Sequence, residues 1–273
     1  MLDHLTQWIA VTDPSHPLLA DFVALGDPDT RRRVERAGDY FVVEGIVAIE
    51  RMLSLPGWHV RGLALLPKVA DRLASRFAHI EVPVAVADEN VLRAVVGFDI
   101  HRGALASVDR AEVVDPGDLI PSNGLLVVAE GVNDQENLGA LYRNAAAFGV
   151  RAVLLDPTCA DPFYRRSVRV SLGNVLAVPT GHLPPLPGGL TGLHQRGVTT
   201  VALTPGAGQP LRDLDRSTLG HGPMALVVGA EGPGLTGETL EASTHRVRIP
   251  MAEGVDSLNV STAAAVALHH LAG

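Results

Sequence analysis

Cysteine, aromatic residues and long hydrophobic runs are all scarce in this sequence of 273 residues. Cys159 is the only cysteine, which excludes an internal disulfide and a metal site built from several cysteines. No apolar run approaches the ~20 residues of a membrane-spanning helix, and residues 1–10 lack the basic start of a signal peptide. We therefore expect a cytoplasmic protein with no membrane partner and no metal. We interpret Cys159 as a small loop residue, with a catalytic thiol as the alternative.

Positive charge is also scarce, because the formal net charge is −8 and Lys68 is the only lysine. That negative charge argues against a nucleic-acid partner, because a protein binds the phosphates of a nucleic acid through basic residues. A local patch matters more than the average, however, and the arginine fork binds phosphate through two hydrogen bonds. Two clusters could form such a patch or, alternatively, a solvated helix face: Arg31, Arg32 and Arg33 with Arg36, and Arg165, Arg166 and Arg169.

Hydrophobic residues, by contrast, make up 47% of the chain, enough for a sizeable core. The pattern predicts an N-terminal α/β domain over residues 1–112, a Pro- and Gly-containing linker over 113–122, and a second α/β domain over 123–273. Unbroken Leu, Val and Ala strands in the second domain indicate a parallel sheet covered on both faces. The predicted strands are 41–43, 61–65, 82–86, 124–129, 152–155, 175–178, 199–203, 225–228 and 247–249. The predicted helices are 44–55, 68–78, 88–96, 138–148, 163–172, 190–195, 235–242 and 258 to the end.

Three strand-to-helix loops of the second domain stand where an open parallel sheet binds its ligands. In the first, Asn137 is expected to cap a helix and Arg143 follows Gly139 on the same helical face. In the second, Gly229 and Glu231 belong to a glycine-rich turn that could present backbone N–H groups to a ligand. In the third, Ser257 or Asn259 could cap the last helix. Each loop taken singly also has a purely structural interpretation. The first would hold a helix cap and a surface arginine, the second would be a tight turn, and the third would be a helix cap.

Together, in this order and with these separations, the three loops resemble the signature motifs of the SpoU/TrmH family of RNA ribose methyltransferases, in the SPOUT superfamily. The resemblance covers about residues 125–270, including the stretch 161–173. Residues 41–45 and 98–103 are similar to the family's N-terminal substrate-binding domain, which itself resembles small RNA-binding ribosomal proteins. Arg102 departs mildly from the usual glutamine, and residues 1–26 match nothing in the family.

The resemblance implies a SPOUT domain with a parallel sheet and a deep C-terminal trefoil knot, a smaller N-terminal α/β RNA-binding domain, and a homodimer. The cofactor it implies is S-adenosylmethionine. Six residues are then expected to bind the cofactor: Leu203, Thr204, Gly229, Ile249, Met251 and Leu258. Five are expected to be catalytic or to position RNA: Arg143, Asn137, Glu231, Ser257 and Asn259. The two arginine clusters are the expected RNA contacts.

The resemblance further implies methyl transfer to a ribose 2′-hydroxyl of RNA, with ribosomal RNA favoured over transfer RNA because of the separate N-terminal domain. An arginine stays charged in proteins, so we expect Arg143 to stabilise developing negative charge and not to act as a base. The alternatives are a transfer-RNA methyltransferase, a non-catalytic RNA-binding or ribosome-assembly factor, and a small-molecule enzyme that uses the glycine-rich turn.

Overall fold

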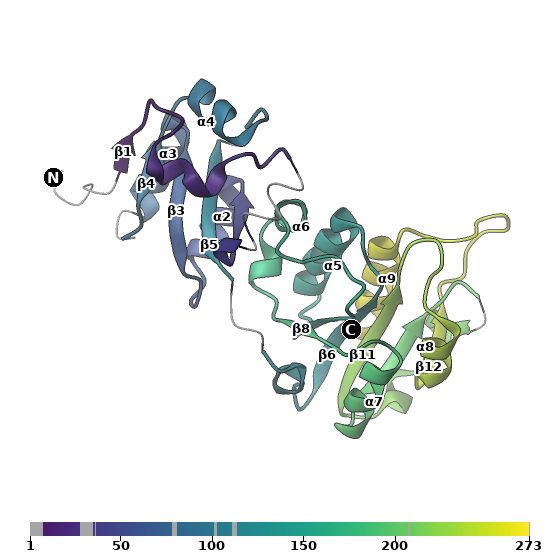
Figure 1. Cartoon of the computed structure of the whole chain (residues 1–273). Coiled ribbons are helices and arrows are strands. Elements are labelled where there is room, and N and C mark those ends of the chain that lie inside the picture. Colours follow the sequence, from purple (N-terminus) through teal and green to yellow (C-terminus); the bar gives the residue numbers. More distant parts are fainter. Residues whose placement is uncertain are drawn as a thin grey trace. The chain divides into compact units, whose positions relative to one another are not determined.

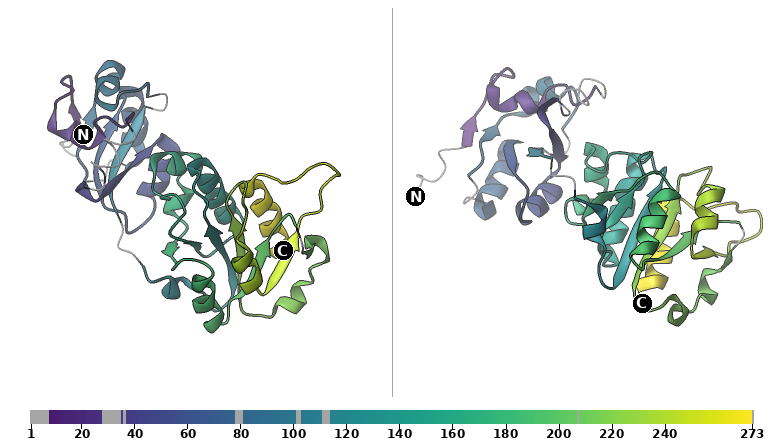
Figure 2. Two further views of the ribbon diagram at one scale, coloured as in Figure 1. Left: turned by 45° about the vertical axis from the view of Figure 1, so that its right-hand side comes forward. Right: turned by 60° about the horizontal axis from the view of Figure 1, so that its bottom comes forward.

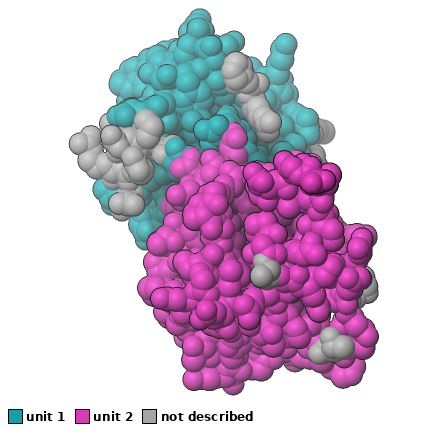
Figure 3. All heavy atoms as spheres, turned by 90° about the vertical axis from the view of Figure 1, so that its right-hand side faces the viewer, with its two compact units in different colours: residues 1–112, 163–173 teal, residues 113–162, 174–273 magenta. Residues whose placement is uncertain are grey.

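In a computed structural model of the chain, the structure describes residues 8–27, 35, 37–77, 81–100, 103–110, 114–206 and 208–272. Arg31, Arg32, Arg33, Arg36 and Arg102 lie outside these residues. The chain divides into two compact units (Figure 3). Unit 1 holds residues 1–112 and 163–173, and unit 2 holds residues 113–162 and 174–273. The segment 163–173, expected in the second domain, therefore belongs to unit 1.

Unit 1 is a five-stranded mixed sheet in the order β1-β4-β3-β5-β2 (Figure 1). The strand β4 pairs in parallel with β1 and with β3, whereas β5 is antiparallel to both β3 and β2. Its elements are β1 Trp8–Ala10, the 3-10 helix η1 Pro17–Phe22, β2 Tyr40–Glu44, α2 Ile46–Leu53, β3 Val60–Leu65, α3 Pro67–Phe77, β4 Val84–Val86, α4 Glu89–Val96, β5 Ala104–Asp109 and α6 Arg165–Val170. The strands β1 and β5 and the helix η1 were not predicted from the sequence.

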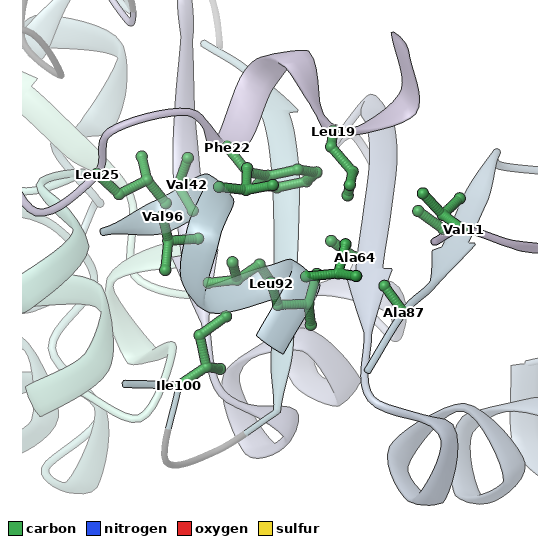
Figure 4. Close-up of a cluster of buried hydrophobic side chains, with 14 of the residues drawn as sticks. Val11, Leu19, Phe22, Leu25, Val42, Ala64, Ala87, Leu92, Val96 and Ile100 are labelled. Atoms are coloured by element: carbon green, nitrogen blue, oxygen red, sulfur yellow. The ribbon is translucent and has the colours of Figure 1, made fainter. Parts of the chain in front are cut away.

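One apolar core of unit 1 lies between the sheet and the helices η1 and α4 (Figure 4). Leu19 and Phe22 of η1 and Leu92 and Val96 of α4 are fully or almost fully buried there. Residues before position 27 thus complete this core, although they match no motif. Asp88 caps α4 by accepting from the backbone N–H of Val91 at 2.9 Å.

The helix α6 also belongs to unit 1, where it packs on β2. Phe163 lies 5.0 Å from the ring of Phe41 and 5.6 Å from that of Trp58. Arg51 of α2 donates to the carbonyl of Leu172 at 2.8 Å. This segment therefore serves the packing of the N-terminal unit.

Unit 2 is a seven-stranded sheet in the order β10-β12-β9-β11-β6-β7-β8, in which every strand pair is parallel, as predicted. Figure 2 shows the ribbon from two further sides. Its elements are η2 Pro116–Leu119, β6 Gly124–Glu130, α5 Gln135–Ala147, β7 Val153–Leu155, η3 Asn174–Leu176, β8 Thr180–His182, α7 Gly188–Gln195, β9 Thr199–Leu203, β10 Gln209–Pro210, η4 Leu211–Asp213, η5 Arg216–Leu219, β11 Pro223–Gly229, α8 Gly237–Ala242, β12 His245–Arg248 and α9 Val260–Ala272.

Helices cover both faces of this sheet. Leu190 and Leu193 of α7 pack with Leu126 and Val128 of β6 in one core cluster. On the other side α5 and α9 contact each other, and α9 contacts the central strand β11. The described residues contain no helix that is both long and apolar enough to cross a bilayer.

Three local predictions for unit 2 need correction. The predicted strand 175–178 is wrong, because residues 174–176 form the 3-10 helix η3 and β8 begins only at Thr180. A short buried apolar run has no periodicity that separates strand from helix. Asn137 does not cap α5; Asp134 does, accepting from the N–H groups of Glu136 and Asn137 at 2.9 and 2.8 Å. Within the predicted linker, η2 packs on β8 and is part of unit 2.

Candidate functional site

A pocket of about 320 Å³ opens at the carboxyl ends of β12, β9 and β11, three neighbouring strands of the parallel sheet. All six residues predicted to bind the cofactor line it: Leu203, Thr204, Gly229, Ile249, Met251 and Leu258. Of the five predicted catalytic residues, Glu231, Ser257 and Asn259 also line it. The second and third motif loops and the loop after β9 therefore meet at this pocket in unit 2, as the parallel topology requires.

Sequence reasoning missed several residues of the same pocket. They are Pro205, Val228, Ala230, Gly232, Gly234, Val260 and Ala263. Each lies within a few positions of a motif residue. The helical spacing of Val260 and Ala263, three apart at the start of α9, was the signal that could have found the last two.

The glycine turn, residues 229–235, follows the central strand β11 and forms one wall of the pocket. Ala230 and Gly234 form an isolated bridge, in which the N–H of Gly234 donates to the carbonyl of Ala230 at 3.0 Å. A Cβ atom at Gly229 would overlap the backbone of Gly234 and Leu235. Only glycine leaves room for this close return of the chain.

Asn259 connects all three loops beside the pocket. Its side-chain Nδ2 donates to Asn137 Oδ1 at 2.7 Å and to Glu231 Oε1 at 2.6 Å. Its Oδ1 accepts from the N–H groups of Ser261 and Thr262 at 3.0 and 3.2 Å, and so caps α9. The backbone donors fix which side-chain atom is the oxygen, so the amide nitrogen faces the other two loops.

The remaining predicted residues lie apart from this network. Ser257 is exposed at the pocket. Arg143 is exposed on α5 and does not line the pocket, and the described residues give its guanidinium no hydrogen-bond partner. Its neighbour Asn144 is tied to the first turn of α9, because its side chain donates to the carbonyl of Ser261 at 2.7 Å. The guanidinium of Arg143 is thus available to a ligand.

Comparison with known proteins then decides the family. Residues 124–269 match the SpoU rRNA Methylase family. The chain belongs to that family. It is 38% identical over 259 residues to an uncharacterised tRNA/rRNA methyltransferase of Mycobacterium tuberculosis, which covers 95% of this chain and 90% of the relative.

Two further relatives are informative about this SpoU family member. A 23S rRNA (guanosine-2′-O-)-methyltransferase, RlmB, of Vibrio cholerae is 36% identical over 236 residues, 83% of this chain and 94% of the relative. The AdoMet-bound rRNA methyltransferase of Sinorhizobium meliloti superposes with a TM-score of 0.81 at 26% identity, covering 97% of each chain. The SpoU family uses S-adenosylmethionine, as the resemblance predicted.

The pocket of this chain fits that cofactor in size and chemistry. Its volume is within the range of small-molecule sites. Leu203, Ile249 and Leu258 offer an apolar lining for a purine ring, and the glycine turn brings backbone polar groups to the opening. Glu231 is the charged side chain among the described lining residues, and a carboxylate suits a cationic sulfonium.

Two arginines of the second cluster, Arg165 and Arg169, are bound to an acid within unit 1. Arg165 donates to Glu44 Oε2 at 2.6 Å and its guanidinium lies 4.3 Å from the centre of the Phe98 ring. Arg169 reaches the same carboxylate oxygen at 3.5 Å. Glu44 is buried, so both arginines serve an ion pair within unit 1, whereas Arg166 is exposed.

Cys159 lies in the loop after β7, and its Sγ donates to the carbonyl of Ala129 at 3.3 Å. Burial raises the pKa of its thiol to about 12. A hydrogen bond from the backbone of Val132 lowers this pKa, and the nearby Asp156 raises it further. A thiol this weakly acidic is a poor nucleophile at neutral pH. The alternative of a catalytic cysteine therefore has no support. Among the described residues, no three His, Cys, Asp or Glu side chains gather as a metal site.

Proposed function

We propose that this chain transfers a methyl group from S-adenosylmethionine to a ribose 2′-hydroxyl of RNA, with ribosomal RNA favoured over transfer RNA. The observation that carries the proposal is the bridge from Asn259 to Asn137 and Glu231 at the mouth of the pocket. It brings the three motif loops to one place. The 36% identity to a 23S rRNA guanosine-2′-O-methyltransferase supports both the ribose oxygen and the ribosomal substrate.

The cofactor is held, in this proposal, by Leu203, Thr204, Gly229, Ile249, Met251 and Leu258. S-adenosylmethionine, when bound, supplies an electrophilic methyl group on a positively charged sulfur. The apolar side chains exclude water from one side of the pocket, and the glycine turn lets the ligand approach the backbone closely. Glu231 favours a cationic ligand over an uncharged one.

The RNA ribose is positioned by groups around the Asn259 bridge. Arg143 holds a phosphate with its bidentate guanidinium and stabilises the negative charge that develops on the 2′-oxygen. Asn137, Glu231 and Asn259 keep the three loops in register, and Ser257 orients the ribose at the exposed rim. Correct placement of the attacking oxygen supplies much of the remaining rate.

Further parts of the proposal concern the assembly. Arg166, with Arg31, Arg32 and Arg33, contacts the RNA, and Arg165 and Arg169 do so on leaving Glu44. The third loop and α9 form a trefoil knot, which is compatible with the contacts of α9 to α5, β11 and η4. A homodimer in the cytoplasm completes the proposal, and Val266, 43% exposed on α9, is a candidate for its interface.

The test is transfer of radiolabel from S-adenosylmethionine to unmodified ribosomal and transfer RNA, followed by nuclease digestion to find the labelled atom. We expect label on a ribose 2′-oxygen of ribosomal RNA, and loss of label with Arg143→Ala. Label only in transfer RNA would correct the substrate. Cofactor binding without transfer to either RNA or to ribosomal particles would favour a non-catalytic assembly factor.

A further inference from the structure

Glu130 is a buried acid at the carboxyl end of β6, and no step of the proposed reaction uses it. Its side chain accepts three hydrogen bonds from Thr236, the N-cap of α8, and from Thr239 in the helix. The N–H of Thr236 donates to Oε2 at 2.9 Å, and the hydroxyls of Thr236 and Thr239 donate to Oε1 at 2.9 and 2.7 Å. All three donors are uncharged. Within the part of the chain that the structure describes, dipoles therefore surround the carboxylate and no cation bonds to it.

The position of these donors connects Glu130 to the pocket. In the sheet, Glu130 is the register partner of Gly229, the first residue of the glycine turn. Thr236, which follows the turn directly, is the N-cap of α8. Sheet pairing thus places Glu130 beside Gly229, where the turn begins. The carboxylate of Glu130 binds Thr236, where the turn ends. The turn between these two fixed points carries Glu231, a partner of Asn259.

The backbone that follows Glu130 is fixed as well. The N–H of Gly131 donates to Oδ1 of Asp156, itself buried, at 3.0 Å. A Cβ atom at Gly131 would lie 3.4 Å from the Cβ of Ala230, so the first loop and the glycine turn are in close packing. A shift of the Glu130 carboxylate would therefore be passed to the pocket wall.

We propose that Glu130 is a positioning residue for the cofactor pocket: it fixes the glycine turn, and with it Glu231, by clamping Thr236 and Thr239. The proposal rests on the proposed function of that pocket. A glutamine has the same shape but one acceptor oxygen, and its NH2 group would face the N–H or hydroxyl donors of α8. A buried carboxylate without a cation is costly, so a neutral residue would be the cheaper choice for packing alone.

The experiment compares the full-length chain with Glu130→Gln and with Glu238→Gln, which removes an exposed acid from the first turn of the same helix. Binding of S-adenosylmethionine is measured by calorimetry, and KM for cofactor and for RNA by label transfer, below the melting temperature of each variant. For Glu130→Gln we expect the Kd and KM for S-adenosylmethionine to rise about tenfold, with KM for RNA within about twofold of wild type. Glu238→Gln should match wild type.

A second pair of variants keeps the test decisive if Glu130→Gln does not fold. Thr239→Val removes one donor from the buried clamp, and Thr239→Ser keeps it. The valine variant should weaken cofactor binding several-fold and the serine variant should restore it. Unchanged cofactor Kd and KM in folded Glu130→Gln or Thr239→Val, with only a lower melting temperature, would overturn the inference. If wild type binds cofactor but transfers no label, the proposed function fails while the calorimetry still tests Glu130.

Discussion

The side-chain nitrogen of Asn259 lies 2.7 Å from the side-chain oxygen of Asn137, although 122 positions separate the two residues. The same nitrogen reaches Glu231, and the oxygen of Asn259 caps α9. One amide thus performs two tasks, a helix cap on one side and a bridge between loops on the other. The two tasks can be separated by mutation.

Asn259→Asp keeps an oxygen that can cap α9 but loses both amide hydrogens and places a second carboxylate beside Glu231. We expect at least a hundredfold loss of methyl transfer with a melting temperature close to wild type. Asn259→Ala should lose activity to a similar extent and also about 1 kcal/mol of stability, because the cap is gone. Label transfer and thermal unfolding measure the two effects. An active Asn259→Asp enzyme would show that the bridge is dispensable.

Arg143 has an exposed guanidinium with no partner among the described residues, so its replacement should leave folding unchanged. We expect Arg143→Ala to lower kcat/KM by about 10²–10³, as for other groups that stabilise developing negative charge. Arg143→Lys keeps the charge without the planar fork, and we expect it to lose about tenfold or more. Near-normal turnover of the lysine variant would exclude a need for bidentate contact.

Gly229→Ala should push the glycine turn away from the end of β11, because the added methyl group overlaps the backbone of Gly234 and Leu235. We expect at least a tenfold weaker affinity for S-adenosylmethionine, measured by calorimetry. Gly237→Ala is the matched control, since a Cβ there meets nothing within 4 Å. Equal cofactor affinity in the two variants would contradict the tight return of the chain.

Glu44→Gln should destabilise unit 1 by about 3 kcal/mol, because it removes the negative charge from an ion pair whose carboxylate is buried. Both tryptophans, Trp8 and Trp58, lie in unit 1, so fluorescence during urea unfolding follows this unit. Glu81→Gln, which changes an exposed acid of the same unit, should stay within about 0.5 kcal/mol of wild type. Similar midpoints for the two variants would mean that the ion pair adds no net stability.

Cys159 should resist alkylation in the native protein at pH 8, because burial raises the pKa of its thiol to about 12. In the unfolded chain the thiol titrates near ~8.5. The unfolded state therefore loses its proton first as pH rises. The contribution of this group to stability is complete below about pH 8, and declines between about pH 9 and 12. Iodoacetamide labelling with and without urea measures the first effect; equal rates would refute the burial.

The sequence predicted the pocket better than it predicted the chain's division into units. All six residues predicted to bind the cofactor line the pocket, at or after the ends of strands whose apolar runs are easy to recognise. Parallel strands bring their carboxyl ends together without any long-range information. The hydrogen bond between Asn259 and Asn137 could not be predicted, because the local sequence does not determine the orientation of an asparagine side chain at the start of a helix. Asp134 and Asn137 are both good capping residues, so local preference alone could not choose between them.

The N-terminal unit was harder to predict for a different reason. The three residues of β1 form too short a run to show alternation, and η1 has no helical period of its own. Arg165 and Arg169 lie close together in the sequence, as arginines that bind phosphate often do, and this spacing suggested an RNA contact. Their partner Glu44 stands 121 positions away from Arg165, and only the fold brings them together.

The two-piece make-up of unit 1, residues 1–112 and 163–173, has a consequence for synthesis. Chains tend to fold domain by domain as they leave the ribosome, at ~5–20 residues per second. This unit emerges first, yet it waits some seconds for its last helix, α6, while β6, α5 and β7 of the other unit are made. During that interval Phe41 and Glu44 lack their partners Phe163 and Arg165. The N-terminal unit is thus the first to begin folding and cannot be complete until part of its neighbour has been translated.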